Sequence, residues 1–120
     1  MSFDDIDGKT IKISSLRYKL NLVDSLDDSP GNISLGEIDY VGGTILIKRN
    51  IQQDQQLLTL FHEIVHGYDY AWMNCKYKLD GEHLANFVSQ IITSVFCDNP
   101  WLCDFISKIK TGVDNEQPKL

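Results

Sequence analysis

The sequence predicts an α+β fold, in which a small antiparallel sheet from the N-terminal half packs on one long helix and one or two further helices. Apolar and polar residues alternate between residues 11 and 47, as in half-buried strands. From residue 53 onward, apolar residues recur every three or four positions, as on amphipathic helices. The 120 residues are expected to form a single domain, with its core at about residues 10–110.

Two pairs of strands are expected. Residues 11–23 alternate on both sides of a short break, which indicates a hairpin or two short strands. Residues 24–32 are rich in Asp, Ser, Pro and Gly, so we expect a loop there. The glycine pair at 42–43 separates two further apolar runs within residues 38–47, which favours a second hairpin.

Three helices are expected after residue 50. The first begins at Gln53 and extends to about Trp72, and Asp80 is a plausible N-cap for the second. Residues 98–100 break the second helix, Pro100 suits the first turn of a third, and 111–120 are expected to be a polar tail. The apolar stripes of the first two helices consist of Leu57, Leu58, Phe61, Ile64, Val65 and Tyr68, and of Leu84, Phe87, Val88, Ile91, Ile92 and Val95.

Composition narrows the function classes. With 11 basic and 17 acidic residues the net charge is −6, which disfavours nucleic acid as a partner. The first ten residues lack the apolar run of a signal peptide and no stretch is long enough to span a membrane, so we expect a cytoplasmic protein without a membrane partner. Cys75, Cys97 and Cys103 include no C-x-x-C pair, so we expect them to be reduced and packed as small apolar residues.

The segment "HEIVH" at residues 62–66 carries an H-E-x-x-H pattern. On a helix, His62 and His66 lie on the same face one turn apart, so both imidazoles can bind one zinc ion. Glu63 lies about 100° round the helix, a direction that favours contact with a metal-bound water over the metal itself. The pattern therefore predicts a zinc site in which Glu63 is the general base.

A catalytic zinc usually has a third protein ligand. The longer metzincin pattern does not continue here, because positions 69 and 72 are Asp and Trp. "GEHLAN", at the start of the second expected helix, offers Glu82 and His83. His83 lies four residues before Phe87, which would point it toward the core or its margin, whereas Glu82 is also the acidic residue favoured at a helix N-terminus. Helical geometry leaves both candidates open.

The order of the hairpin "LGEIDYVGGTILI", the helix "QQLLTLFHEIVHGYDY" and the segment "EHLANFVSQ" resembles small phage and prophage members of the ImmA/IrrE-like metallopeptidase family. The resemblance covers about residues 35–98. It implies a minimal zincin-like fold and a cytoplasmic zinc endopeptidase, in which His62, His66 and Glu82 bind the metal and Glu63 is the base. Better-known members cleave repressors of mobile elements, and they carry further domains for which this chain is too short.

Several polar residues are secondary candidates. Tyr68, Tyr70 and Tyr77 follow the motif and are candidate donors to a developing oxyanion, or they simply pack. Asn86 and His83 are candidates for orienting a ligand. By analogy with zincins, we expect residues 45–48 to form a sheet edge to which an extended peptide adds.

Two functions follow from these observations. The first is a zinc metallopeptidase that acts on a protein or peptide substrate, such as a regulator. The alternative is a catalytically silent zincin-fold protein that modulates a host regulator or defence factor. The oligomeric state is not predicted.

Overall fold

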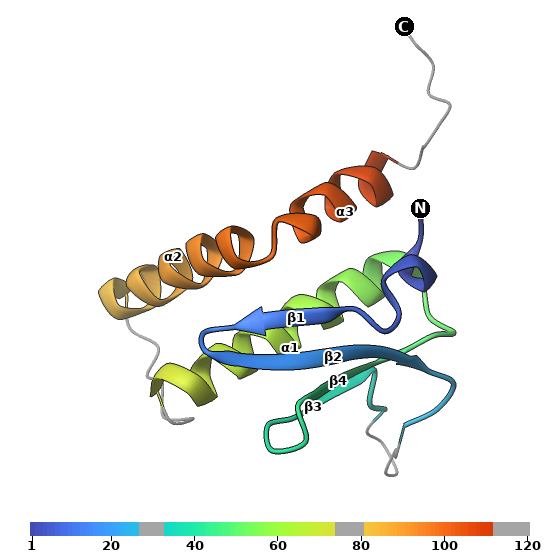
Figure 1. Ribbon diagram of the computed structural model, residues 1–120, viewed down its shortest axis with the longest axis horizontal. Helices are drawn as coiled ribbons and strands as arrows, with labels where there is room; N and C mark the ends of the chain where they lie inside the picture. Colours follow the sequence, from blue (N-terminus) through green and yellow to red (C-terminus); the bar gives the residue numbers. More distant parts are fainter. Residues whose placement is uncertain (27–32, 74–80, 112–120) are drawn as a thin grey trace, which may run out of the picture.

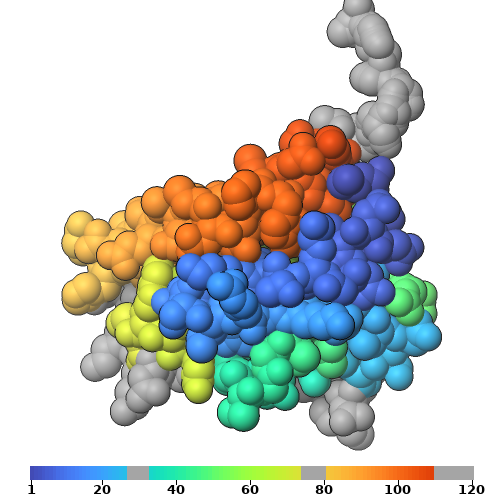
Figure 2. Space-filling model, in the orientation of Figure 1, coloured from blue at the N-terminus to red at the C-terminus, as the bar shows by residue number. Residues whose placement is uncertain are grey.

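The computed structural model describes residues 1–26, 33–73 and 81–111. Helix α1 lies across one face of a four-stranded sheet, while α2 and α3 follow one another along the β1 edge (Figure 1). In the space-filling view, α2 and α3 form a continuous ridge beside β1 and the N-terminal turn (Figure 2). The elements are a 3-10 turn η1 (Phe3–Ile6), strands β1 (Thr10–Ile13), β2 (Leu16–Val23), β3 (Gly36–Asp39) and β4 (Thr44–Lys48), and helices α1 (Gln53–Met73), α2 (Gly81–Asp98) and α3 (Pro100–Thr111).

The sheet has the strand order β1-β2-β4-β3. Both expected hairpins are confirmed, because β1 pairs with β2 and β3 with β4 in antiparallel fashion. The expectation of a wholly antiparallel sheet is wrong, since β2 and β4 are parallel neighbours. Alternation within a strand does not encode the direction of its neighbour, and this is why the sequence pattern missed the mixed sheet.

The same topology corrects the expected sheet edge. Strand β4, which contains residues 45–48, is paired on both sides, and β3 is the outer strand. A peptide adding to this end of the sheet would therefore pair with β3.

Alternation along the strands puts one face of the sheet against α1. Arg17 and Lys19 of β2 point away from this core and are exposed. The core also begins earlier than residue 10, because Phe3 and Ile6 of η1 are buried and Phe3 packs edge-on against Phe105 of α3. The buried residues of the sheet and of α1 include Ile11, Ile13, Tyr18, Leu20, Ile45, Ile47, Leu60, Ile64 and Tyr68. These elements confirm the α+β class.

Helix α1 continues through Gly67, as expected. A Cβ atom at this position would lie 2.8 Å from Cδ1 of Ile13 and 3.4 Å from Cδ1 of Ile38. Glycine therefore allows α1 to approach the sheet directly after the histidine pair. The expected stripe of α1 is only partly buried, since Leu58 and Val65 are exposed.

Helices α2 and α3 are separated at Asn99, which confirms the expected break before Pro100. Only half of the expected α2 stripe is buried: Phe87, Ile91 and Val95 join the core, whereas Leu84, Val88 and Ile92 are exposed. The stripe prediction is wrong for these three residues because α2 lies along the edge of the sheet, where only one side of the helix is covered (Figure 1).

Cys97 and Cys103 are unbridged, as expected, but both are exposed, so the prediction that they are packed inside is wrong for these two. Cys75, Tyr77, Asp80 and residues 112–120 lie outside the described residues, and so does most of the expected loop at 24–32. Within the described part of the chain, no helix has both the length and the apolar character needed to cross a membrane.

Candidate metal centre on α1

The two histidines of the motif converge on one point at the surface of α1. Both side chains are exposed, and their Nε2 atoms lie 3.1 Å apart. The ring centroids are 4.7 Å apart and the rings are inclined by 75°, so the rings are not stacked and the two nitrogens approach each other at their tips. This is the arrangement expected for His62 and His66 one helical turn apart.

The separation of the two nitrogens suits a shared metal ion. Two imidazole nitrogens that bind one tetrahedral zinc at about 2.0–2.1 Å are about 3.3 Å apart. The observed 3.1 Å between Nε2 of His62 and Nε2 of His66 is close to this value. The donor pair therefore fits zinc with little movement of either ring.

Glu63 points away from the exposed surface, toward the sheet. Glu63 is only 5% exposed, although the preceding residue, His62, is exposed. Its carboxylate lies beside Gly36 of β3, where a Cβ atom would be 3.4 Å from Oε2 of Glu63. The absence of a side chain at position 36 thus leaves room for the carboxylate between α1 and the edge strand.

Burial raises the pKa of the Glu63 carboxyl. The Coulomb attraction of His62 and His66 lowers the pKa, and the nearby charge of Glu37 on β3 raises it further. The net result is a pKa above the ordinary value of 4.5. A more basic carboxylate is a better proton acceptor near neutral pH, as general-base catalysis requires.

His62 and Glu63 line the same hollow between α1 and the start of β3. This hollow has a volume of about 270 Å³ and is lined by Ser34, Leu35, Gly36, Leu58, Thr59, His62 and Glu63. A small molecule in it can therefore contact the carboxylate and the first histidine together. Gly36, the first residue of the outer strand β3, belongs to the lining, so the hollow lies beside the start of that strand.

Glu82, the third expected ligand, lies in the first turn of α2, and its side chain is exposed. Across residues 1–26, 33–73 and 81–111, no group of three His, Cys, Asp or Glu side chains lies close enough to hold a metal ion. The structure thus brings His62 and His66 together without Glu82. His83 and Asn86 are also exposed on α2, so of the two directions expected for His83, the core and its margin, the core is excluded.

The tyrosines occupy different environments. Tyr68 is fully buried beside Trp72, with the two rings 4.5 Å apart, and burial raises its pKa to about 12. This position in the core does not suit contact with a substrate at the surface. Tyr70 is half-buried and stacks on Tyr40, which follows β3, at a ring distance of 4.3 Å. This stack ties α1 to the β3–β4 turn.

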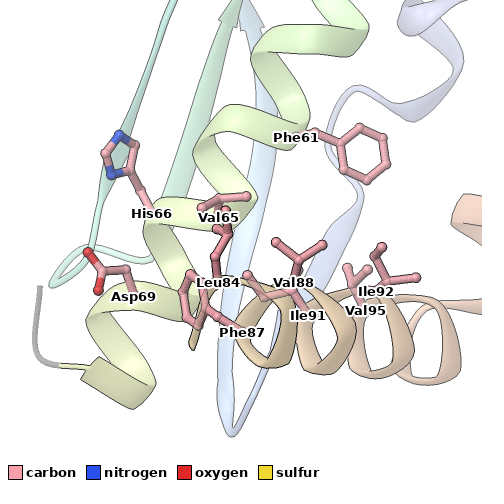
Figure 3. A pocket seen from close by; sticks show the side chains of 10 residues that line it. All are labelled: Phe61, Val65, His66, Asp69, Leu84, Phe87, Val88, Ile91, Ile92 and Val95. Atoms are coloured by element: carbon pink, nitrogen blue, oxygen red, sulfur yellow. The ribbon is translucent and has the colours of Figure 1, made fainter. Parts of the chain in front are cut away.

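A second hollow, which the sequence did not predict, lies on the other side of the histidine pair. It runs between α1 and α2, includes His66 in its wall, and has a volume of about 310 Å³ (Figure 3). Its apolar lining comes largely from the expected stripe of α2, of which half is exposed. The apolar stripe of α2 covers more of the helix surface than a helix at the edge of a sheet can bury. The width of the stripe is therefore the feature of the sequence that could have indicated this hollow.

Comparisons with protein-family models, with curated proteins and with solved structures find no match to this chain.

Proposed function

We propose that the protein is a zinc-dependent metallopeptidase of the cytoplasm that hydrolyses a peptide bond in a protein substrate. The observation that carries the proposal is the 3.1 Å approach of the His62 and His66 Nε2 atoms, next to a buried glutamate that shares a hollow with His62. A structural metal site would have no use for such a base. The combination of two converging donors and a basic carboxylate favours hydrolysis.

Each residue of the motif has a separate role. His62 and His66 would hold the ion through their Nε2 atoms, and bound zinc supplies a Lewis acid that polarises a carbonyl group and acidifies water. Glu63 would accept a proton from a water molecule in the hollow beside β3 and return it to the leaving amine. Burial assists this role because it raises the affinity of the carboxylate for the proton.

The family resemblance supports Glu82 as the third ligand, and its place in the first turn of α2 is the corresponding position in this chain. His83 is the matched alternative, since it is the neighbouring residue and is also exposed. The proposal therefore expects zinc binding to draw the start of α2 toward the histidine pair.

Metal content per chain tests the site directly. We expect about one zinc in the wild type, Glu63→Gln and His83→Ala proteins, and loss of zinc in His62→Ala and Glu82→Ala. Elemental analysis after incubation with zinc and removal of free ions gives the measurement. A wild-type protein that takes up no zinc would rule out the proposed centre.

Cleavage of a fluorescein-labelled casein tests the chemistry. We expect zinc-dependent release of label by the wild type and a loss of about 10²–10⁴-fold in Glu63→Gln, which retains the metal. Equal cleavage by both proteins would show that Glu63 is not the base. If a captured partner bound equally to both and stayed uncut, the catalytically silent interaction protein would be the better description.

A further inference from the structure

The face of the sheet that points away from α1, here called the outer face, is open to solvent. The strands place their buried residues on the opposite face, against α1. Figure 2 shows the molecule from the outer side, with β1 and β2 uncovered at its centre. Within the described part of the chain, α2 and α3 follow the β1 edge and do not lie over this face (Figure 1). A partner can therefore reach the outer face without displacing a described helix.

The outer face carries a cluster of positive charge. Residues 10–23, which form β1, β2 and the turn between them, contain Lys12, Arg17 and Lys19 but no acidic residue. All three side chains belong to the outer face, because their neighbours along each strand pack into the core. This concentration of positive charge contrasts with the chain as a whole, whose net charge is −6.

The pairing of β1 with β2 brings the three charges together. Lys12 lies directly opposite Arg17, and Lys19 lies two residues beyond Arg17 on the same strand. Like charges at opposite positions of an antiparallel pair repel one another, so this arrangement does not stabilise the sheet. The Lys12 Nζ lies 3.9 Å from a carboxylate oxygen of Asp98, which partly neutralises it. Arg17 and Lys19 are exposed and form no ion pair with any residue in the ranges 1–26, 33–73 and 81–111.

Hydroxyl groups flank Lys19 on both sides. Thr10 lies opposite Lys19 on β1, and Thr44 lies opposite it on β4. Ammonium, guanidinium and hydroxyl groups are all donors to carboxylates. In the described strands, the outer face has no aromatic side chain on which a nucleic acid base could stack. The chemistry of this face therefore favours carboxylate groups as its ligands.

We propose that the outer face is a docking surface for an extended acidic segment of a partner protein, in which Asp or Glu occupies every second position. Side chains two residues apart on a strand lie on one face about 6.7 Å apart, and alternate carboxylates of an extended peptide have the same spacing. Two successive carboxylates of the partner can therefore meet Arg17 and Lys19 together. The negative net charge of the chain disfavours a polyphosphate in the same place.

Two nine-residue peptides test the spacing. Both contain four glutamates and five serines, with the glutamates at alternate positions in one and in succession in the other, so their charges are equal. Each is titrated at low salt into the isotope-labelled protein, and amide NMR shifts measure and locate the binding. We expect the alternating peptide to bind about 3–10-fold more tightly, because it aligns one or two more ion pairs. The largest shifts are expected at Arg17, Lys19 and Thr44.

Three results of the peptide titration would overturn the proposal. Equal affinities for the two peptides would show that the spacing on β2 is not read. Shifts spread over basic residues on every element would indicate a general attraction. Shifts centred on His62 would place the peptide at the histidine pair instead of the outer face.

Two charge substitutions form a matched pair. Lys19→Gln removes a charge from the outer face, whereas Lys108→Gln removes the same charge from an exposed position on α3. We expect Lys19→Gln to weaken binding of the alternating peptide by about 3–5-fold and Lys108→Gln to change it by less than about 1.5-fold. Both residues are exposed, so both variants should melt with the wild type. Equal losses of affinity in the two variants would reject the outer face as the binding site.

Two further measurements address other occupants. A nine-nucleotide oligothymidylate is expected to bind more weakly than the alternating peptide at the same ionic strength, and tighter binding would reject an acidic peptide in favour of nucleic acid. The wild type and Lys19→Gln are expected to sediment alike at low salt. An assembly of the wild type that Lys19→Gln dissociates would show that a second copy covers the face, against the proposal.

The outer face uses neither the histidine pair nor Glu63, so its test is separate from that of the proposed function. The preference for the alternating peptide is expected to be the same in His62→Ala as in the wild type. It would stand even if the protein took up no zinc. A preference that disappears in His62→Ala would place the peptide at the candidate metal centre and contradict the docking surface.

Discussion

Asn99 bonds to the backbone of Lys12 in both directions. The Lys12 N–H donates to Oδ1 of Asn99 at 2.8 Å, and Nδ2 of Asn99 donates to the Lys12 carbonyl at 2.8 Å. Nδ2 also donates to the Val95 carbonyl at 2.9 Å, and Asn99 is only 2% exposed. The residue between α2 and α3 thus pairs with the outer side of β1 much as another strand would.

Asn99→Ala is therefore expected to lower the free energy of unfolding by about 2–4 kcal/mol, because it removes three side-chain hydrogen bonds and takes their partner from the part-buried N–H and C=O groups of Lys12. Urea unfolding followed by circular dichroism measures the loss. Asn50→Ala is the control, since Asn50 is exposed, and a change within about 0.5 kcal/mol is expected there. Equal effects of the two substitutions would contradict the assigned role of Asn99.

Gly36→Ala is expected to destabilise the protein by about 1–3 kcal/mol through overpacking. A Cβ atom at position 36 would overlap Cγ2 of Thr59 and lie 2.9 Å from the backbone carbonyl of Leu46, so β3 would have to move away from α1. Gly81→Ala is the matched control, because a Cβ atom there meets nothing within 4 Å. Thermal unfolding distinguishes the two, and the prediction fails if Gly36→Ala melts with the wild type.

Glu63→Gln is expected to stabilise the metal-free protein at pH 7. Burial raises the pKa of Glu63 in the folded state above the ordinary value of 4.5. The folded protein therefore holds this proton more tightly than the unfolded chain does, which stabilises the fold below about pH 4.5. This contribution to the free energy of unfolding is lost as the pH rises through the folded pKa. Glutamine avoids this loss. Melting temperatures should be higher for Glu63→Gln at pH 7 and should converge with the wild type near pH 4; a lower melting temperature at pH 7 would contradict the burial.

The raised pKa of the Tyr68 hydroxyl predicts that the protein loses stability at alkaline pH. Its pKa is about 12 in the folded protein and 10.0 ordinarily, so the unfolded chain releases this proton first as the pH rises. The contribution is complete well below pH 10 and falls by about 2 kcal/mol as the pH rises from 10 to 12. Urea unfolding at pH 9 and 11.5 should show a smaller decline for Tyr68→Phe than for the wild type. Parallel declines would mean that Tyr68 ionises normally.

Local patterns in the sequence predicted the hairpins, the helices and the convergence of His62 on His66. Each of these depends on residues close together in the chain, where backbone geometry alone fixes which side chains share a face. The break at Asn99 is also a local effect. Pro100 has no backbone N–H to donate to the last turn of α2, so α2 ends before it.

The features that the sequence patterns did not predict depend on how the helices and strands pack on one another. The direction of β2 relative to β4 depends on the course of the chain between them, and the exposure of Val88 depends on where α2 lies on the sheet. The position of Glu82 relative to His62 depends on the same placement of α2. This explains why the two-histidine part of the site follows from the motif while its third member needs an experiment.

The parallel pairing of β2 with β4 has a consequence for the order of folding. Each hairpin joins neighbouring segments, whereas Lys19 pairs with Thr44 and Val23 with Lys48, so the centre of the sheet closes a loop of about 25 residues. Closing that loop loses chain entropy before its contacts form, which makes such pairings slow. We therefore expect the two hairpins to form early and their union to limit the folding rate, with substitutions at the β2–β4 junction slowing folding more than those in either turn.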